Sequence, residues 1–302
     1  MNLEQFIYIT EVYKKGSISN AAKSCHVSIP AISQSIANLE KELDVKIFNR
    51  SRMGAIPTPE GLKIIRKANN IIASIEDIHK LTKPKNNLIQ GNLNINAIPS
   101  LIILIFKAAF DFKKDYPDVE IKITEKSTPE IKEAIEMNKD EIGFLQINTE
   151  LLGDSDNWIY QTLMKDKMYL CVNHESPLRL KRVVEPHEFL DEKIVLYSGI
   201  NYQKIIDQYF EKYGAMQVLF ESNQFEIIKK TIAEGFAVGL LSGLLLKNDP
   251  RVKNGEIIPV PVKGFSDIEV PYGWLRMKNV HFSLNAREFL KYVNKQIQSG
   301  DY

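Results

Sequence analysis

The sequence predicts an α/β protein that carries an N-terminal all-α winged helix-turn-helix. Residues 17–40, SISNAAKSCHVSIPAISQSIANLE, have the pattern of two short helices joined by a sharp turn. From about residue 91, short apolar strands alternate with amphipathic helices, which is typical of α/β domains. A segment with the composition of a linker, KPKNNLIQGN at 83–92, separates these two parts.

Composition and charge agree with a soluble protein of about two domains. The 302 residues are 44% hydrophobic and 25% charged. Residues 1–90 hold 13 Lys and Arg against 8 Asp and Glu, whereas the remainder holds 26 against 30. This modest bias supports a polyanionic partner at the N-terminus. The longest nearly apolar run, residues 235–246, is too short to span a bilayer. We see no signal peptide, so we expect a cytoplasmic protein with no membrane partner.

The first two helices are defined by their ends. Gly16 is expected to end the first helix, and Ser17 or Ser19 to cap the second by accepting hydrogen bonds from free backbone N–H groups. The small residues Ala21 and Ala22 would allow the next helix to cross closely over this one. The sequence therefore predicts a compact pair of crossed helices.

The third helix should carry the recognition surface. Ser28 is the expected N-cap, with Pro30 in the first turn, where a missing N–H has no cost. The N-terminal residues of such a helix enter the major groove, where Gln34 can bond an adenine edge. The alternative is an ordinary solvent-facing helix. Candidate DNA-binding residues, including two arginines of the predicted wing, are Ser28, Ile29, Pro30, Ala31, Ser33, Gln34, Arg50 and Arg52.

Residues 45–61 fit a short β-ribbon followed by a helix start, with Thr58 as the N-cap. Arg50 and Arg52 suit phosphates or the minor groove, although Arg50 could instead form a structural ion pair. The expected domains are a head at 1–58, a linker or dimerisation helix and hinge at 59–90, and a body at 91–302.

The helix that begins at Pro59 is predicted to be long and to have two apolar stripes. Leu62, Ile65 and Ile72 form one stripe. One stripe can lie on the head, and the other needs a partner. Heptad spacing favours a second copy of the same helix, although packing inside one domain is the alternative. The expected dimerisation residues are Ile64, Ala68, Ile71, Ile75 and Ile78.

The body is expected to form two α/β subdomains with parallel sheets, at 91–161 plus 268–302 and at 162–267. The carboxyl ends of strands in such sheets collect ligands. Polar residues at these ends are candidate ligand contacts, although Ser, Thr and Asn also cap helices in general. The four candidates are Ser100, Thr128, Ser198 and Asn223, and Thr128 is also the expected cap of the helix predicted at 129–138.

No pattern in the chain points to catalysis or to a metal. The two cysteines, Cys25 and Cys171, lie far apart and have no metal-ligand spacing. We find no nucleophile elbow, phosphate loop or paired histidine ligands. The sequence therefore predicts a protein that is not an enzyme and needs no cofactor.

The N-terminal segment resembles the DNA-binding head of LysR-type transcriptional regulators. Weaker matches continue through the body as GNLNI, FKKDYPDVEIKI and AEGFAVGLL, so the resemblance covers almost the whole chain. The head residues that carry the resemblance are Gly16-Ser17, Ala21-Ala22, His26-Val27-Ser28, Pro30-Ala31, Ser33, Ile36, Leu39-Glu40, Glu42-Leu43, Phe48, Arg50, Thr58 and Gly61.

The resemblance implies a sequence-specific regulator whose partners are a double-stranded DNA operator and itself, as a homodimer or homotetramer. It also implies a body similar to periplasmic binding proteins, with a small-molecule effector, a carboxylate for example, between its subdomains. RNA polymerase is a further candidate partner. The rival hypothesis is an α/β small-molecule-binding protein or enzyme with an incidental helical N-terminal domain.

The chain departs from the family pattern in the recognition helix. Ile29 stands where the family usually has glutamine, and Gln34 where an arginine is common. Ala37 and Asn38 occupy positions that are often basic. We therefore expect an unusual operator preference and a lower non-specific affinity for DNA, because fewer cations face the phosphates.

Overall fold

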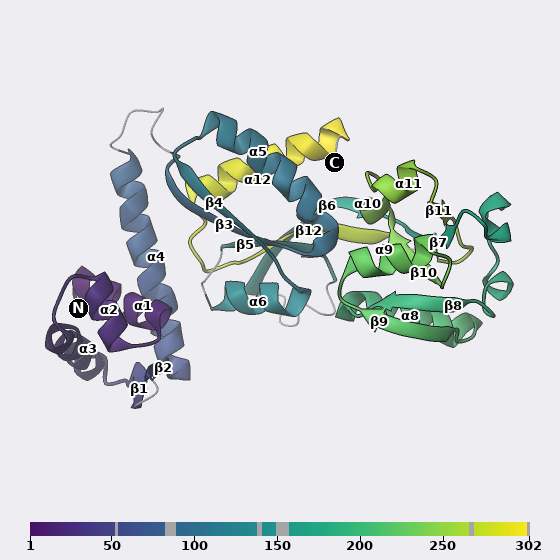
Figure 1. The fold of residues 1–302 in the computed structure, drawn as a ribbon. Coiled ribbons are helices and arrows are strands. Elements are labelled where there is room, and N and C mark those ends of the chain that lie inside the picture. Colours follow the sequence, from purple (N-terminus) through teal and green to yellow (C-terminus); the bar gives the residue numbers. More distant parts are fainter. Residues whose placement is uncertain (52–53, 82–88, 138–140, 149–156, 266–268, 301–302) are drawn as a thin grey trace.

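The computed structural model describes residues 1–51, 54–81, 89–137, 141–148, 157–265 and 269–300. Figure 1 shows a small helical head, one long helix and an elongated α/β body. The described helices are α1 (Leu3–Lys15), α2 (Ile18–Ser24), α3 (Ile29–Leu43), α4 (Pro59–Leu81), α5 (Ile102–Asp115), α6 (Thr128–Glu136), α8 (Ile200–Tyr213), α9 (Phe225–Ala233), α10 (Gly243–Leu246), α11 (Pro250–Lys253) and α12 (Leu284–Ser299). None of them is long and apolar enough to cross a bilayer.

The described strands form three sheets. Their bounds are β1 (Phe48–Ser51), β2 (Gly54–Pro57), β3 (Gly91–Ala97), β4 (Val119–Glu125), β5 (Ile142–Gln146), β6 (Trp158–Asp166), β7 (Met168–Asn173), β8 (Lys193–Tyr197), β9 (Gln217–Ser222), β10 (Val238–Ser242), β11 (Ile257–Val260) and β12 (Val270–Met277).

The head is the predicted winged helix-turn-helix. Ser17 caps α2 by accepting from the Asn20 N–H, and Ser28 caps α3 by accepting from the Ala31 N–H at 3.3 Å. Strands β1 and β2 pair antiparallel as the wing. The Ala55 N–H donates to the Gly16 carbonyl at 2.9 Å, so the wing is attached to the end of α1.

Helix α4 begins in direct contact with the head. Thr58 is its cap, because the Thr58 hydroxyl accepts from the Gly61 N–H at 2.9 Å. A Cβ on Gly61 would lie 2.1 Å from the Ile47 carbonyl oxygen, so only glycine allows this close approach. Ile65 of the next turn is buried in the head core. The head and the start of α4 therefore form one packed unit.

The body contains two mixed sheets, with strand orders β4-β3-β5-β12-β6 and β11-β7-β10-β8-β9. Only the strands joined by helical crossovers are parallel, for example β3 with β4 and β8 with β9. Strands β6, β7, β11 and β12 make antiparallel pairs. The prediction of parallel sheets was thus wrong for these strands, because β12 enters the first sheet from the second subdomain and runs against β5.

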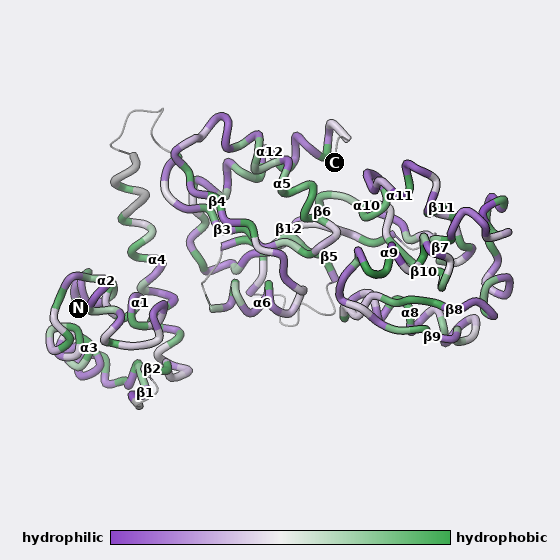
Figure 2. The backbone as a smooth tube through the Cα atoms, in the orientation of Figure 1, coloured by the Kyte–Doolittle hydropathy of each residue, from purple (hydrophilic) through white to green (hydrophobic). Residues whose placement is uncertain are grey.

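The first sheet takes its strands from 91–166 and 270–277, and the second from 168–260. The expected boundary after residue 161 falls inside β6, whose pairing with β12 continues to Asp166. Helices α5 and α12 cover one face of the first sheet, with the Phe112 and Phe289 rings 5.7 Å apart. In Figure 2 the tube is hydrophobic along β8, whose three middle residues are buried and which lies between β10 and β9 in the second sheet.

Candidate functional site

Helix α3 has one buried face and one exposed face. Ile29 is 50% exposed, and Pro30, Ala31 and Gln34 are exposed as well. The Gln34 side chain donates to Asn38 Oδ1 at 2.9 Å on the solvent side. The fully buried residues of the inner side are Ile32, Ile36 and Leu39. The structure therefore presents the predicted base-contacting residues outward, next to the Ser28 cap.

Ser33 and Arg50 differ from the other candidates because they contact each other. The Arg50 guanidinium donates to the Ser33 hydroxyl at 2.8 Å and lies 3.7 Å from the Glu40 carboxylate. Glu40 also accepts the backbone N–H groups of Ile47 and Phe48 at 2.8 and 3.1 Å. Arg50 thus joins the wing to α3, which is the structural ion pair that the sequence left open.

The rest of the wing offers an apolar contact that the sequence analysis did not single out. Ile56 on β2 is 64% exposed. The Arg52 candidate lies outside the described residues. An isoleucine is common in strands, so the sequence carries no signal that this one points into solvent.

The apolar stripe proposed for dimerisation on α4 divides into two parts. Ala68 is 1% exposed and lies in the head core, with Ile64 packed against that core. Ala68 therefore cannot contact a partner chain, which corrects the prediction. Ile71 and Ile78 are 41% and 60% exposed, and Ile75 is half-buried. The stripe changes from inward to outward because the head covers only the first turns of α4.

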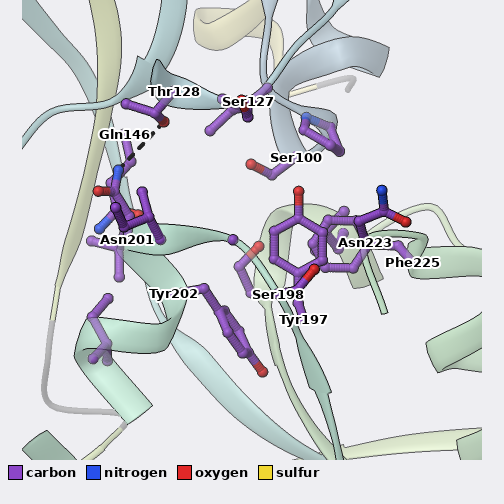
Figure 3. A pocket seen from close by; sticks show the side chains of 18 of the residues that line it. Ser100, Ser127, Thr128, Gln146, Tyr197, Ser198, Asn201, Tyr202, Asn223 and Phe225 are labelled. Carbon is purple, nitrogen blue, oxygen red and sulfur yellow. Dashed lines mark hydrogen bonds between the residues drawn. The ribbon is translucent and has the colours of Figure 1, made fainter. Parts of the chain in front are cut away.

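A cavity of about 290 Å³ lies between the two subdomains. All four candidate effector residues line it, two from each subdomain: Ser100, Thr128, Ser198 and Asn223. Figure 3 shows their side chains around one space. The carboxyl ends of β3, β4, β8 and β9 thus meet at the cavity, as the rule for α/β sheets predicts.

These four residues precede or begin helices, but they are not the caps. Ser127 caps α6, and its N–H and hydroxyl both donate to Glu130, at 2.8 and 2.5 Å. Thr128, the predicted cap, is the first residue of the helix. Gly199 precedes α8 with no side-chain cap and no acidic residue in the first turn. The start of α8 therefore has free N–H groups, whereas that of α6 already holds a carboxylate.

One hydrogen bond crosses the cavity from one subdomain to the other. Asn201 Nδ2 donates to Thr128 Oγ1 at 3.5 Å, drawn as the dashed line in Figure 3. Asn201 is 7% exposed. Because the bond is long, it is a weak link between the subdomains.

Aromatic rings form a second part of the lining. Tyr197 and Phe225 stack with centroids 4.1 Å apart and planes 16° apart, and the Tyr202 ring meets Tyr197 edge-on. The Tyr202 hydroxyl donates to the Leu240 carbonyl. Burial raises the pKa of Tyr202 well above its usual value and that of Tyr272 to about 12. These phenols are neutral at physiological pH.

The described residues that line the cavity include no Lys, Arg, His, Asp or Glu, so none of them is charged. Acidic side chains that do not line the cavity act on the lining tyrosines. Burial and the Glu125 and Glu130 carboxylates raise the pKa of Tyr197. Burial also raises the pKa of Asp166, near Tyr272. This lining can bind a small molecule by hydrogen bonds and stacking, and its described part offers no nucleophile with an adjacent base.

Several lining residues were not among the sequence candidates. Gln146 ends strand β5, so the rule that selected Ser198 would also have found it, and Tyr197 ends β8 directly before that candidate. Tyr272 had no such signal. It reaches the cavity because β12 runs antiparallel, which places the start of β12 beside Gln146.

Family models match the two parts of the chain separately. Residues 3–62 match the model "Bacterial regulatory helix-turn-helix protein, lysR family". Residues 86–298 match "LysR substrate binding domain". The first match covers the head with the start of α4, and the second covers most of the body.

Relatives and solved structures show the same architecture along the chain. The regulator CysB from Burkholderia cenocepacia is 26% identical over 86% of this chain and 83% of its own length. A full-length OxyR variant from Pseudomonas aeruginosa superposes with a TM-score of 0.76 over 99% of this chain and 95% of its own, at 19% identity. The CcmR regulatory domain from Synechocystis, solved in complex with 2-PG, has a TM-score of 0.61 at 19% identity, over 68% of this chain and 97% of its own. The chain belongs to the LysR family of transcriptional regulators, with a helix-turn-helix DNA-binding domain and a substrate-binding domain.

Proposed function

We propose that the cavity between the two subdomains binds the small-molecule effector, and that its occupancy changes how the heads engage an operator. One observation carries this proposal. Residues from both subdomains line a single cavity of about 290 Å³ and are joined across it by the Asn201–Thr128 hydrogen bond. A ligand there contacts both subdomains at once, so it has a different affinity for open and closed arrangements.

The lining favours a compact ligand with a flat or apolar part and one polar end. The Tyr197–Phe225 stack offers the flat surface. The start of α8, with its free N–H groups and the Ser198 hydroxyl, suits a carboxylate. The start of α6 is less suited, because Glu130 already occupies it. A ligand with two or more negative charges fits poorly, since the described lining supplies no cation.

The head is proposed to read the operator through Ile29, Ala31 and Gln34, the exposed side chains near the start of α3. Gln34 can pair with an adenine edge, and Ile29 can contact a thymine methyl group. Two heads of a homo-oligomer would read an inverted repeat. A contact with RNA polymerase and a cytoplasmic location stay predictions.

Two further apolar faces support assembly of the body. Ile103, Phe106 and Phe110 on α5 are 54%, 59% and 59% exposed beside the edge strand β4. On the other subdomain, the edge strand β9 exposes Val218, Leu219 and Phe220. Contiguous exposed apolar residues of this kind mark interaction sites. We propose that the α5 face of one protomer meets the β9 face of its partner, in addition to pairing of α4 through Ile71, Ile75 and Ile78.

Ligand binding is tested by native mass spectrometry of the full-length protein, followed by identification of any retained metabolite. Ser198→Ala and Phe225→Ala should reduce the fraction of protein that carries that mass, whereas Gln203→Ala, on α8 outside the cavity, should leave it unchanged. If both cavity variants retained the metabolite as the parent protein does, the ligand would bind outside this cavity.

DNA binding is tested by footprinting on the DNA upstream of the gene and its neighbours at moderate salt. Protection of an inverted repeat supports the proposal, and protection of no sequence contradicts it. Assembly is tested by light scattering: Phe110→Lys and Ile78→Lys should each reduce the mass, and Lys107→Ala should not.

A further inference from the structure

Asn70 on α4 holds the loop after β12 with both ends of its side-chain amide. Asn70 Nδ2 donates to the Asn279 carbonyl at 2.5 Å, and the His281 N–H donates to Asn70 Oδ1 at 3.0 Å. The preceding turn of α4 is packed into the head through Ala68. This two-point contact therefore ties the helix that carries the head to one loop of the body.

The loop held by Asn70 is itself fixed to β12. The Arg276 guanidinium donates to the Met277 and Val280 carbonyls at 3.1 and 3.5 Å. It also lies 4.7 Å from the centroid of the Phe282 ring, which stacks on Trp274 at 6.2 Å. Through its two hydrogen bonds and its cation–π contact, Arg276 fixes the position of the loop relative to β12.

One face of β12 connects this loop to the cavity. Alternate residues of a strand share a face, so Tyr272, Trp274 and Arg276 lie on the same side. Tyr272 lines the cavity, and its pairing with Gln146 places it at the end of β5. The same eight-residue strand thus has the cavity at its start and the Asn70 loop at its end.

The charge of one α6 residue also acts on the head. Thr128, at the start of this helix, lines the cavity, and Glu133 lies further along it. Burial raises the pKa of the head residue Tyr13, nearby Arg66 lowers it, and the Glu133 carboxylate raises it. The charge of α6 therefore reaches the head, whereas Asn70 makes hydrogen bonds to the loop of β12, and both α6 and β12 begin at the cavity.

We infer that Asn70 is the positioning residue through which the state of the cavity reaches the DNA-binding head. The inference rests on the proposed function and adds its regulation. A ligand that moves Tyr272 shifts β12 and its loop, and the two hydrogen bonds of Asn70 carry this shift to α4. Rigid elements joined by few contacts can transmit such a change when both sites bias the same arrangement.

The contact itself is tested by amide hydrogen exchange in the full-length protein. In Asn70→Ala the His281 amide loses its acceptor and should exchange about fivefold faster, the equivalent of one hydrogen bond. The neighbouring variant Asn69→Ala is the matched control and should leave this amide unchanged. Unaltered exchange at His281 in Asn70→Ala would overturn the contact.

The coupling between the cavity and the head is tested without a ligand, by a crosslink that fixes the distance between the two subdomains across the cavity. Cysteines at Thr128→Cys and Asn201→Cys, in a Cys25→Ser background, are joined by a short bis-maleimide. Cys171 is fully buried and stays unlabelled. Crosslinking should change the operator Kd by about fivefold or more when Asn70 is present. In Asn70→Ala the change should fall below about twofold, with the oligomeric mass unchanged.

Two results would overturn the inference: an equal change in Kd without Asn70, or no change with it. If no variant binds an operator, the proposed function fails on its own. The exchange rate of the His281 amide then still decides the structural part, because crosslinking must alter that rate if the cavity and the loop are connected.

Discussion

The surface of helix α3 and the cavity between the two subdomains are built in opposite ways. The helix surface comes from one stretch of chain, in which Ser28 begins α3 and Ile32 and Ile36 turn its other side inward. The cavity is assembled from segments spread between residues 98 and 272. A local surface depends on caps and periodicity, whereas a cavity depends on the topology that brings strand ends together. The two regions should therefore respond to mutation in different ways.

The largest effect is expected from Gly61→Ala, which breaks the head and spares the cavity. The new Cβ would lie 2.1 Å from the Ile47 carbonyl oxygen, and backbone atoms cannot move away cheaply. Overpacking of this kind costs about 1–3 kcal/mol. Hydrogen exchange should show loss of protection in α1–α4 alone, with operator binding abolished. Glu60→Ala, one residue earlier, is the control, and equal loss of protection in the body would contradict the comparison.

Gln34→Ala tests whether α3 acts as a local reading surface. Loss of a bidentate contact to adenine should cost about 1–3 kcal/mol on the true operator and almost nothing on random DNA. The exposed position of Gln34 predicts an unchanged melting temperature. Titrations of both DNAs by fluorescence anisotropy measure the ratio. An equal loss on both DNAs would mean that Gln34 contacts phosphate or supports the fold instead.

Phe225→Ala tests the cavity with a smaller expected effect. Removing the Phe225 ring takes away the stacked partner of Tyr197 and leaves only the edge-on contact with Tyr202. An aromatic pair contributes about 0.5–1.5 kcal/mol, so retention of the bound metabolite should fall about 2- to 12-fold while free-protein operator binding stays the same. The measurement is competition dialysis with the metabolite found by mass spectrometry. Phe236→Ala, an exposed aromatic residue outside the cavity, should behave as the parent protein.

The smallest effect is expected from Arg50→Ala. Arg50 is partly exposed and is engaged by Ser33 and Glu40 within the head. An exposed ion pair contributes about 0–1 kcal/mol, so stability should fall only slightly. Because the Arg50 guanidinium is engaged by Ser33 and Glu40 rather than by a DNA phosphate, the slope of log Kd for DNA against log salt concentration should change by less than about one. A full unit of change would show that Arg50 leaves its partners for a phosphate.

The sequence was most informative where neighbours along the chain decide the outcome. The Ser28 and Thr58 caps and the outward Gln34 all follow from spacing within a turn or two. The four cavity residues were found by a rule about strand ends, yet the cap at Ser127 was misplaced by one residue. The Ala68 error has a similar origin, because periodicity defines a stripe but not how far along α4 the head extends.

The sequence by itself determined a winged helix-turn-helix head, an outward third helix and a body of alternating strands and helices, because these depend on local propensity and periodicity. The LysR-type character of the head rested on its resemblance to that family. Only the tertiary structure decided that β12 runs antiparallel beside β5, that Tyr272 therefore reaches the cavity, and that Asn70 holds the loop at the other end of the strand. The two hydrogen bonds of Asn70 join residues 209 and 211 positions apart. No local pattern encodes such pairings, since they arise from the order in which the chain crosses between its two subdomains.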